Sequence, residues 1–406
     1  MTRTLFVIAT TLLLARSVTA QTGQSASKAI PIRQLGKVTA VARDTLCPRI
    51  VTRGLSDGRV LVGVFAYGTP PDAGRRRVKL FDSTLQSYKL IFDSTSMPQL
   101  IRYLGDTTLA LDQPSRTMIV LDAQGKTVRS MAIPKQQDFP GLVGFIRTPW
   151  IDPKGRLVYQ GIAQRPPVAS PALRLVPFLP DSAPIVRGDF DTRTVDTIAM
   201  VKIVKPGILE VKETVGSVSV RAFVDPTSTA DEWAMLPDGT IAIVRERDYH
   251  IDWIAPDGTR TSTPKMPFEW VRVTDDQKRA IVDSLKATVD TLRTQNPPTT
   301  IQTPDGPVKV SVDFQPLPID KFPDFEPPIN PGSVRADLDG NLWIVPRTTA
   351  AAKGGLLYDV VNRKGEIFER VQFPPGVALV GFGPGGVVYL NRVVGNSGFL
   401  ERAKVR

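Results

Sequence analysis

Four arginines that follow short apolar runs are the residues whose types and spacing best suit chemistry: Arg245, Arg247, Arg347 and Arg392. A guanidinium group binds carboxylate, phosphate or sulfate in bidentate fashion. Arginines that converge on one face of a fold therefore predict a site for an anionic ligand. The alternative is that each arginine pairs with a nearby acid, such as Glu246 or Asp248, or faces solvent.

Three further polar residues stand in the same expected loops: Tyr249, His250 and Asn391. His250 is the single histidine of the chain. Histidine is the usual general acid–base near neutral pH, but a lone histidine that begins the apolar run YHIDWI more often makes one structural hydrogen bond. A multi-histidine metal site is excluded, and no nucleophile-elbow motif supports a catalytic triad. We predict no catalytic residue and assign these three residues, with the four arginines, to ligand binding.

Six short phrases would position these side chains. Each has a turn with Gly or Asp followed by a run of β-formers, and they read SDGRVLVGV, GDTTLALD, DPKGRLVYQ, PDGTIAIVR, DLDGNLWIV and GPGGVVYLN. Asp-Gly and Gly-Gly permit the positive φ of a tight hairpin, here expected as a two-residue turn. Turn chemistry explains Asp152, Asp238 and Asp339, to which we assign no function. A second, more strictly alternating phrase, such as LYDVVNRKGEIFERVQF, follows in each unit and predicts two partly exposed strands.

The spacing of these turns predicts a β-propeller. Successive first turns lie 48, 49, 84, 101 and 46 residues apart, and a four-stranded blade has a period in the forties. The two long intervals require insertions, at about 160–187 and 266–332. The last unit lacks a strand, which the run GKVTAVARD near the N-terminus supplies, because a propeller must close its ring. We predict an all-β, six-bladed propeller of four-stranded blades over 36–406, closed by an N-terminal strand; the alternative is two stacked β-sandwich domains.

The phrases DLDGNLWIV and DPKGRLVY resemble the blade phrase of six-bladed propellers of the NHL-repeat and gluconolactonase-like superfamily, exported bacterial type. Gluconolactonase-like relatives hold a divalent metal with Glu, Asn and Asp, for which Asp231 or Glu232 with Asn391 would be the candidates here. The corresponding positions of the other units are Arg or aliphatic, so the resemblance carries no metal site over. Streptogramin-lyase-like relatives use histidines that this chain lacks.

The second insertion should contain one helix. Thr274 and Gln277 form a capping-box pattern, and an apolar stripe follows over about 275–294. This helix is expected to pack on the propeller, or to serve as a lid or partner-binding element.

The N-terminus predicts export. Residues 1–20 combine an early Arg3, a short apolar run and a small-residue ending, which is typical of a signal peptide; an uncleaved anchor is the alternative. Residues 21–35 would form an N-terminal extension. The full chain has 51 basic and 40 acidic residues, a balance that favours anionic surfaces. Cys47 is the single cysteine, so no intrachain disulfide forms.

These observations predict an exported scaffold, periplasmic or extracellular, that binds an anionic small molecule, a glycan or a protein. We expect a monomer without nucleic-acid binding, without a membrane span in the mature chain and without a cofactor, although a divalent metal such as calcium is possible. The alternatives are a metal-dependent hydrolase or lactonase with oxygen ligands in the central channel, and a purely structural envelope component.

Overall fold

The computed structural model describes residues 30–47, 49–65, 76–94, 99–112, 115–143, 149–168, 170, 172–205, 207–347 and 354–405. The expected signal peptide, and most of the expected extension after it, lie outside these residues. No helix among the described residues combines the length and the apolar character that a membrane crossing requires.

Six sheets of the described chain share one plan, in which each strand pairs antiparallel with the next. Sheet I contains β3 (Ile50–Gly54), β4 (Val60–Phe65), β5 (Arg76–Phe81) and β6 (Tyr88–Ser94). Sheet II contains β7 (Leu100–Arg102), β8 (Thr108–Asp112), β9 (Thr117–Leu121) and β10 (Thr127–Ala132). Sheet III contains β11 (Trp150–Ile151), β12 (Leu157–Gln160), β13 (Ser182–Gly188) and β14 (Val195–Lys202). Sheet IV contains β17 (Glu232–Met235), β18 (Ile241–Arg245), β19 (His250–Ile254) and β20 (Arg260–Ser262).

The last two sheets of this plan take strands from the N-terminal region. Sheet V contains β23 (Ile329–Ala336), β24 (Leu342–Pro346), β25 (Leu357–Val361) and β26 (Ile367–Gln372), with β1 (Ile32–Gln34) added in parallel. Sheet VI contains β27 (Val377–Gly383), β28 (Val387–Val394), β29 (Ser397–Lys404) and, from the N-terminal region, β2 (Val38–Val41). The prediction that an N-terminal strand completes the final sheet is confirmed. Between sheets II and III lie η1 (Gln136–Asp138) and α1 (Phe139–Val143).

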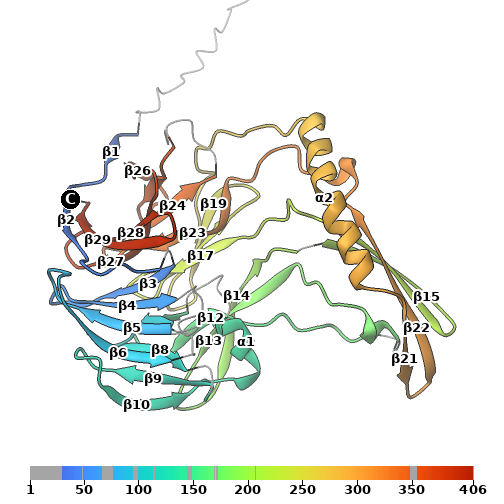
Figure 1. Cartoon of the computed structure of the whole chain (residues 1–406), viewed down its shortest axis with the longest axis horizontal. Helices are drawn as coiled ribbons and strands as arrows, with labels where there is room; N and C mark the ends of the chain where they lie inside the picture. The colour runs from blue at the N-terminus through green and yellow to red at the C-terminus, as the bar shows by residue number, and fades with distance from the viewer. Residues whose placement is uncertain are drawn as a thin grey trace, which may run out of the picture.

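Apolar clusters join these six sheets in sequence and back to the start. The clusters contain Leu61 with Ala110 (I and II), Leu109 with Leu157 (II and III), Ile185 with Trp233 (III and IV), Val244 with Leu342 (IV and V), Val360 with Leu390 (V and VI), and Leu400 with Val60 (VI and I). First strands of neighbouring sheets are in contact: β27 with β3, β3 with β7, β7 with β11, and β17 with β23. Each fully buried Leu contributes about 1.5–3 kcal/mol relative to an exposed one. This arrangement of four-stranded antiparallel sheets is that of a β-propeller (Figure 1).

The turns follow the expected chemistry with one difference. Gly58, Gly155, Gly239 and Gly340 all adopt positive φ, between 79° and 88°. The hairpins are longer than two residues, however, because the closing hydrogen bond in sheet IV runs from the Leu236 amide to the Thr240 carbonyl. The turn aspartates accept hydrogen bonds from their own loops, as between the Thr240 amide and the Asp238 carboxylate at 3.0 Å.

A seventh sheet, which the sequence did not predict, lies outside the ring. This module sheet runs β15 (Gly207–Thr214), β16 (Ser217–Val224), β22 (Gly306–Pro316) and β21 (Thr299–Thr303) in spatial order, with β16 and β22 parallel. Helix α2 (Asp275–Gln295) packs against β22 and against η3 (Ile319–Lys321), and the capping box of Thr274 and Gln277 is present. The short helix η2 (Ala172–Leu175) packs on β16.

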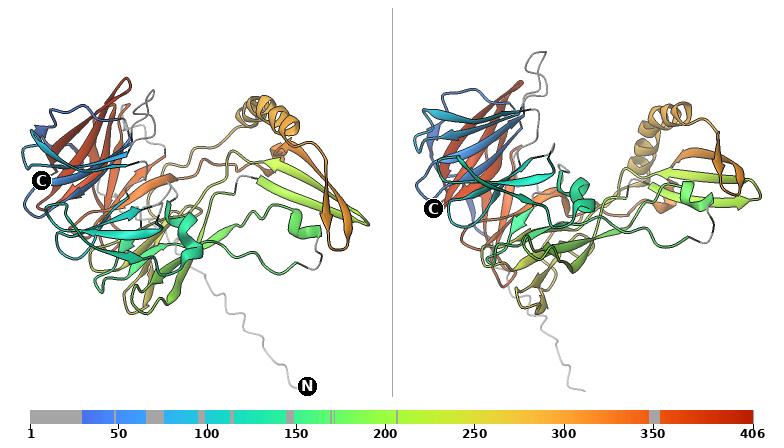
Figure 2. Two further views of the ribbon diagram at one scale, coloured as in Figure 1. Left: turned by 60° about the horizontal axis from the view of Figure 1, so that its bottom comes forward. Right: turned by 90° about the horizontal axis from the view of Figure 1, so that it is seen from below.

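The module is therefore assembled from three insertions: the β12–β13 connection, the β14–β17 connection and the β20–β23 connection. Figure 2 shows it standing beside the ring of sheets in both views. A short antiparallel neck, residues 271–273 with 324–326, links the two parts: the Val273 amide donates to the Asp324 carbonyl at 2.8 Å, and the Glu326 amide donates to the Val271 carbonyl at 2.9 Å.

Candidate functional site

The predicted binding residues occur where second strands end. Arg245 is the last residue of β18, Arg347 follows β24, and Asn391 and Arg392 lie in the second half of β28. Strand pairing brings the beginnings of the first strands to the same edge: Glu232 opposes Val244, and Val377 opposes Arg392. These residues thus lie at the same edge of their respective sheets. The arginines at this edge contact acidic residues of the chain.

Arg245 is held by two carboxylates. Its Nη1 donates to Asp231 Oδ2 at 2.7 Å, and its Nε donates to Asp252 Oδ2 at 2.7 Å. Burial alone would lower the pKa of Arg245, but the hydrogen bonds to Asp252 and Asp231 outweigh burial and raise this pKa. Asp231 also accepts hydrogen bonds from the amides of Lys202 and Glu246. The guanidinium of Arg245 is therefore committed to an internal network.

Asp252 connects this network to the histidine. Its Oδ1 accepts a hydrogen bond from Ser262 Oγ at 2.5 Å and lies 3.3 Å from His250 Nε2. Burial acts to raise the pKa of Asp252, yet the hydrogen bonds from Ser262 and Arg245 lower it. His250 is half-buried, and its contact with Asp252 is of the kind that a structural histidine makes.

Arg392 is also engaged. It binds Glu401 in bidentate fashion, with Nε to Oε1 at 2.6 Å and Nη2 to Oε2 at 3.1 Å. The hydrogen bond to Glu401 raises the pKa of Arg392. The neighbouring Asn391 is buried. Glu401 lies on the partner strand β29, as Asp252 lies on the partner strand β19 of Arg245, and neither acid is adjacent to its arginine in the sequence.

The remaining two arginines are exposed. Arg347 Nε lies 3.7 Å from Glu326 Oε2, with the two side chains 40% and 30% exposed. Arg247 is exposed in the turn after β18, where Asp248 instead pairs with Lys265 at 3.0 Å. Arg245, Arg347 and Arg392 each lie beside different acidic residues of the described chain.

Tyr249 begins a ladder of aromatic rings that leads from the core to the surface. Tyr249 is fully buried, with a positive φ of 48°, and its ring centroid lies 5.5 Å from that of Phe268. Phe268 lies 5.2 Å from Trp270, and Trp270 lies 6.3 Å from Phe325, both edge to face. Trp270 is 43% exposed and Phe325 is 46% exposed. Burial raises the pKa of Tyr249 well above its ordinary value, and the charge of Asp359 adds to this effect.

The outer rings of this ladder form a surface on the neck. Arg272 opposes Phe325 in the neck pairing, and the ring contacts place Trp270 next to both Phe268 and Phe325. We call Phe268, Trp270, Arg272, Phe325 and Arg347 the neck surface; Arg347 is included because its Nε lies 3.7 Å from Glu326, the residue after Phe325. Its components come from segments far apart in the sequence, so only the alternation of Phe268, Trp270 and Arg272 in the sequence could have pointed to it.

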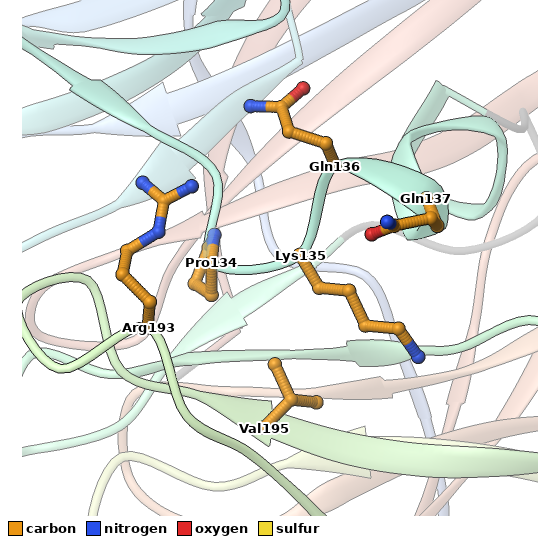
Figure 3. Close-up of a pocket in the computed structure, with 6 residues that line it drawn as sticks. All are labelled: Pro134, Lys135, Gln136, Gln137, Arg193 and Val195. Atoms are coloured by element: carbon orange, nitrogen blue, oxygen red, sulfur yellow. The ribbon is translucent and has the colours of Figure 1, made fainter.

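A metal centre and a small-molecule pocket are the two other kinds of site that the described residues could form. No group of three or more His, Cys, Asp or Glu side chains there has a geometry that could hold a metal ion. An open depression of about 550 Å³ is lined by Pro134, Lys135, Gln136, Gln137, Arg193 and Val195. Figure 3 shows that the Lys135 side chain extends away from those of Gln136 and Arg193, so the polar groups do not converge on one ligand position.

Comparisons with known proteins return solved structures alone. No family model and no curated protein matches the chain. TolB from Acinetobacter baumannii is similar at 12% identity over 87% of this chain, with a TM-score of 0.38, and the match spans 65% of that protein's length. Virginiamycin B lyase from Staphylococcus aureus is similar at 11% identity, with coverage of 89% and 88% and a TM-score of 0.34. Regucalcin from Agrobacterium tumefaciens, a calcium-binding protein, is similar at 10% identity, with coverage of 92% and 97% and a TM-score of 0.37. The lyase activity and the calcium binding belong to those proteins.

Proposed function

We propose that this chain is an exported β-propeller scaffold that binds a protein partner through the neck surface. The observation that carries the proposal is the exposure of Trp270 and Phe325 at the end of a ladder anchored in the core by Tyr249. Protein interfaces concentrate their binding energy in Trp, Tyr and Arg residues held by a rigid support. The neck surface combines Trp270, Arg272 and Arg347 with Phe325, a residue type that is also enriched at interfaces.

A protein partner fits these contacts better than a small anion or a glycan. Arg245 and Arg392 are occupied by carboxylates of the chain itself, so an anion would have to displace an internal partner. Trp270 stands at 88° to Phe268 and at 82° to Phe325, which makes a ridge of rings rather than a flat platform on which a sugar ring stacks. A ridge flanked by arginines suits an apolar groove with an acidic rim on a partner.

Six blades and export belong to the same proposal. The six inter-sheet clusters support a ring of six blades with the module sheet outside it, and the DLDGNLWIV phrase supports kinship with NHL-repeat and gluconolactonase-like propellers. The composition of residues 1–20 supports cleavage and export. N-terminal sequencing of the exported protein should begin after Ala20; an exported protein that begins at Met1 would contradict cleavage, and a protein confined to the cytoplasmic fraction would contradict export.

The test of function compares three forms of the mature chain, residues 21–406, as immobilised bait for envelope proteins. These are the unmodified chain, the double variant Trp270→Ala with Phe325→Ala, and the control Tyr88→Ala, an aromatic that is 45% exposed on sheet I. We expect one protein to be captured by the unmodified chain and the control, and to be lost from the double variant at unchanged melting temperature. Retention by the double variant would refute the neck surface. Binding of a polyanion or glycan in place of any protein would refute a protein partner.

A further inference from the structure

The outer edge of the module sheet is unpaired within the described chain. β15 is the terminal strand in the order β15-β16-β22-β21 (Figure 1), and seven of its eight residues are exposed or partly exposed. Ile208 and Val211 on this strand, and Val215 at its hairpin turn, are exposed apolar side chains. An exposed strand edge is a template for pairing with another chain.

The hairpin fixes which residues of β15 have free backbone groups. Val215 and Gly216 form a two-residue turn between the paired Thr214 and Ser217, and the pair that closes such a turn exchanges both of its hydrogen bonds. Because hydrogen-bonded pairs alternate along an antiparallel ladder, the even-numbered residues of β15 bond to β16. Leu209, Val211 and Glu213 therefore direct their N–H and C=O groups outward.

Glu210 and Lys212, two of the charged side chains of β15, are self-complementary about Val211. A twofold axis through this residue pairs Val211 with its own copy and Leu209 with Glu213 of the second copy, so that outward-facing backbone groups meet. The same register places Glu210 opposite Lys212 of the second copy, and Lys212 opposite Glu210. Glu210 already accepts a hydrogen bond from Arg221 on β16 at 3.1 Å, so the pairing continues a row of alternating charge: Arg221, Glu210, then Lys212 of the second copy.

We propose that β15 is a homodimerisation edge, on which a second copy of this chain adds its own β15 in antiparallel orientation about Val211. This inference is independent of the proposed function, and it replaces the expectation of a monomer. The dimer would be closed, because one patch meets itself around a twofold axis.

Other registers and the other edge fit less well. An axis through Glu210 would set Glu210 against itself, and an axis through Lys212 would set Lys212 against itself; like charges directly opposite are destabilising. The edge strand β21, of sequence TTIQT, is short and carries no charge, so pairing with it leaves Glu210 and Lys212 without cross-strand partners.

Charge reversal tests the proposal in the full mature chain by sedimentation velocity across a concentration series. The unmodified chain should show a monomer–dimer equilibrium that weakens as salt rises. Glu210→Lys and Lys212→Glu should each be monomeric, because each places like charges opposite each other. An equimolar mixture of these two variants should form a heterodimer, since every Lys then meets a Glu, and the double variant Glu210→Lys with Lys212→Glu should form a homodimer again.

A backbone variant separates strand pairing from general charge effects. Proline is tolerated on an edge strand where its missing N–H faces solvent, so Val211→Pro should keep the melting temperature close to that of the unmodified chain and abolish the dimer. A chain that stays monomeric at all soluble concentrations would overturn the proposal. A dimer that survives the single charge reversals, or a mixture of the variants that stays monomeric, would overturn it equally.

Discussion

Replacement of Arg245 by alanine should destabilise the fold far more than replacement of Arg347. Asp231 is 8% exposed in its side chain and Arg245 is 27% exposed, with 2.7 Å between their bonded atoms. Removal of one partner of a buried ion pair costs about 3–5 kcal/mol, and partial access of water to the Arg245 position reduces this to about 2–3 kcal/mol. Arg347 and Glu326 are both substantially exposed and 3.7 Å apart, so Arg347→Ala should cost about 0–1 kcal/mol.

Urea unfolding followed by tryptophan fluorescence measures both losses from the shift in midpoint at constant slope. Arg245→Met is the matched control, because methionine keeps an apolar stem of similar length and removes only the charge and its hydrogen bonds. We expect Arg245→Met to lose nearly as much stability as Arg245→Ala. Equal stability of Arg245→Met and the unmodified chain would assign the effect to packing of the side-chain stem. Equal losses for Arg245→Ala and Arg347→Ala would contradict the role of the ion pair with Asp231.

Three further outcomes follow from the same contacts. The pKa of Asp252 is lowered in the folded state. Its ionised carboxylate therefore stabilises the fold above the unfolded pKa near 3.9, and this stabilisation is lost as pH falls through the folded pKa. Asp252→Asn should reduce the loss of stability at acid pH, and an unchanged loss would contradict the role of the hydrogen bonds to Asp252. Thr274→Ala removes the α2 cap and should cost about 0.5–2 kcal/mol, seen as faster hydrogen exchange in the first turn of α2; unchanged exchange would count against the cap. Leu342 is fully buried in the apolar cluster between sheets IV and V, so Leu342→Ala should lower the free energy of unfolding by about 2–5 kcal/mol. Leu90→Ala, at an exposed position, should lower it by about 0.5 kcal/mol or less. Equal losses would contradict the packing of Leu342 in this cluster.

Local patterns in the sequence predict most of the ring. The apolar runs after each glycine turn form second strands, the run near Val38 completes sheet VI, and Thr274 caps a helix. These features depend on alternation, turn residues and caps, which are properties of neighbouring residues.

The module sheet and the partners of the arginines depend on contacts that a local pattern does not encode. β16 pairs in parallel with β22, although sheet IV and α2 lie between them in the sequence. Charged residues on β15 obscure the strand pattern of that segment. Arg392 pairs with Glu401 on the next strand. The acids expected from the sequence, Glu246 and Asp248, are neighbours of Arg245 and Arg247 and do not include this partner. Burial of Tyr249, expected at the surface, follows from packing between sheets IV and V.

Site-specific photo-crosslinking tests the central claim most directly. A photoreactive residue at position 270 of the full chain, produced in its own host, would report what lies against the neck surface, with position 88 as the matched control of similar exposure. The account predicts one discrete covalent adduct with a single protein at position 270, and none with that protein at position 88. An adduct common to both positions, or no adduct at position 270, would contradict a protein-binding neck surface.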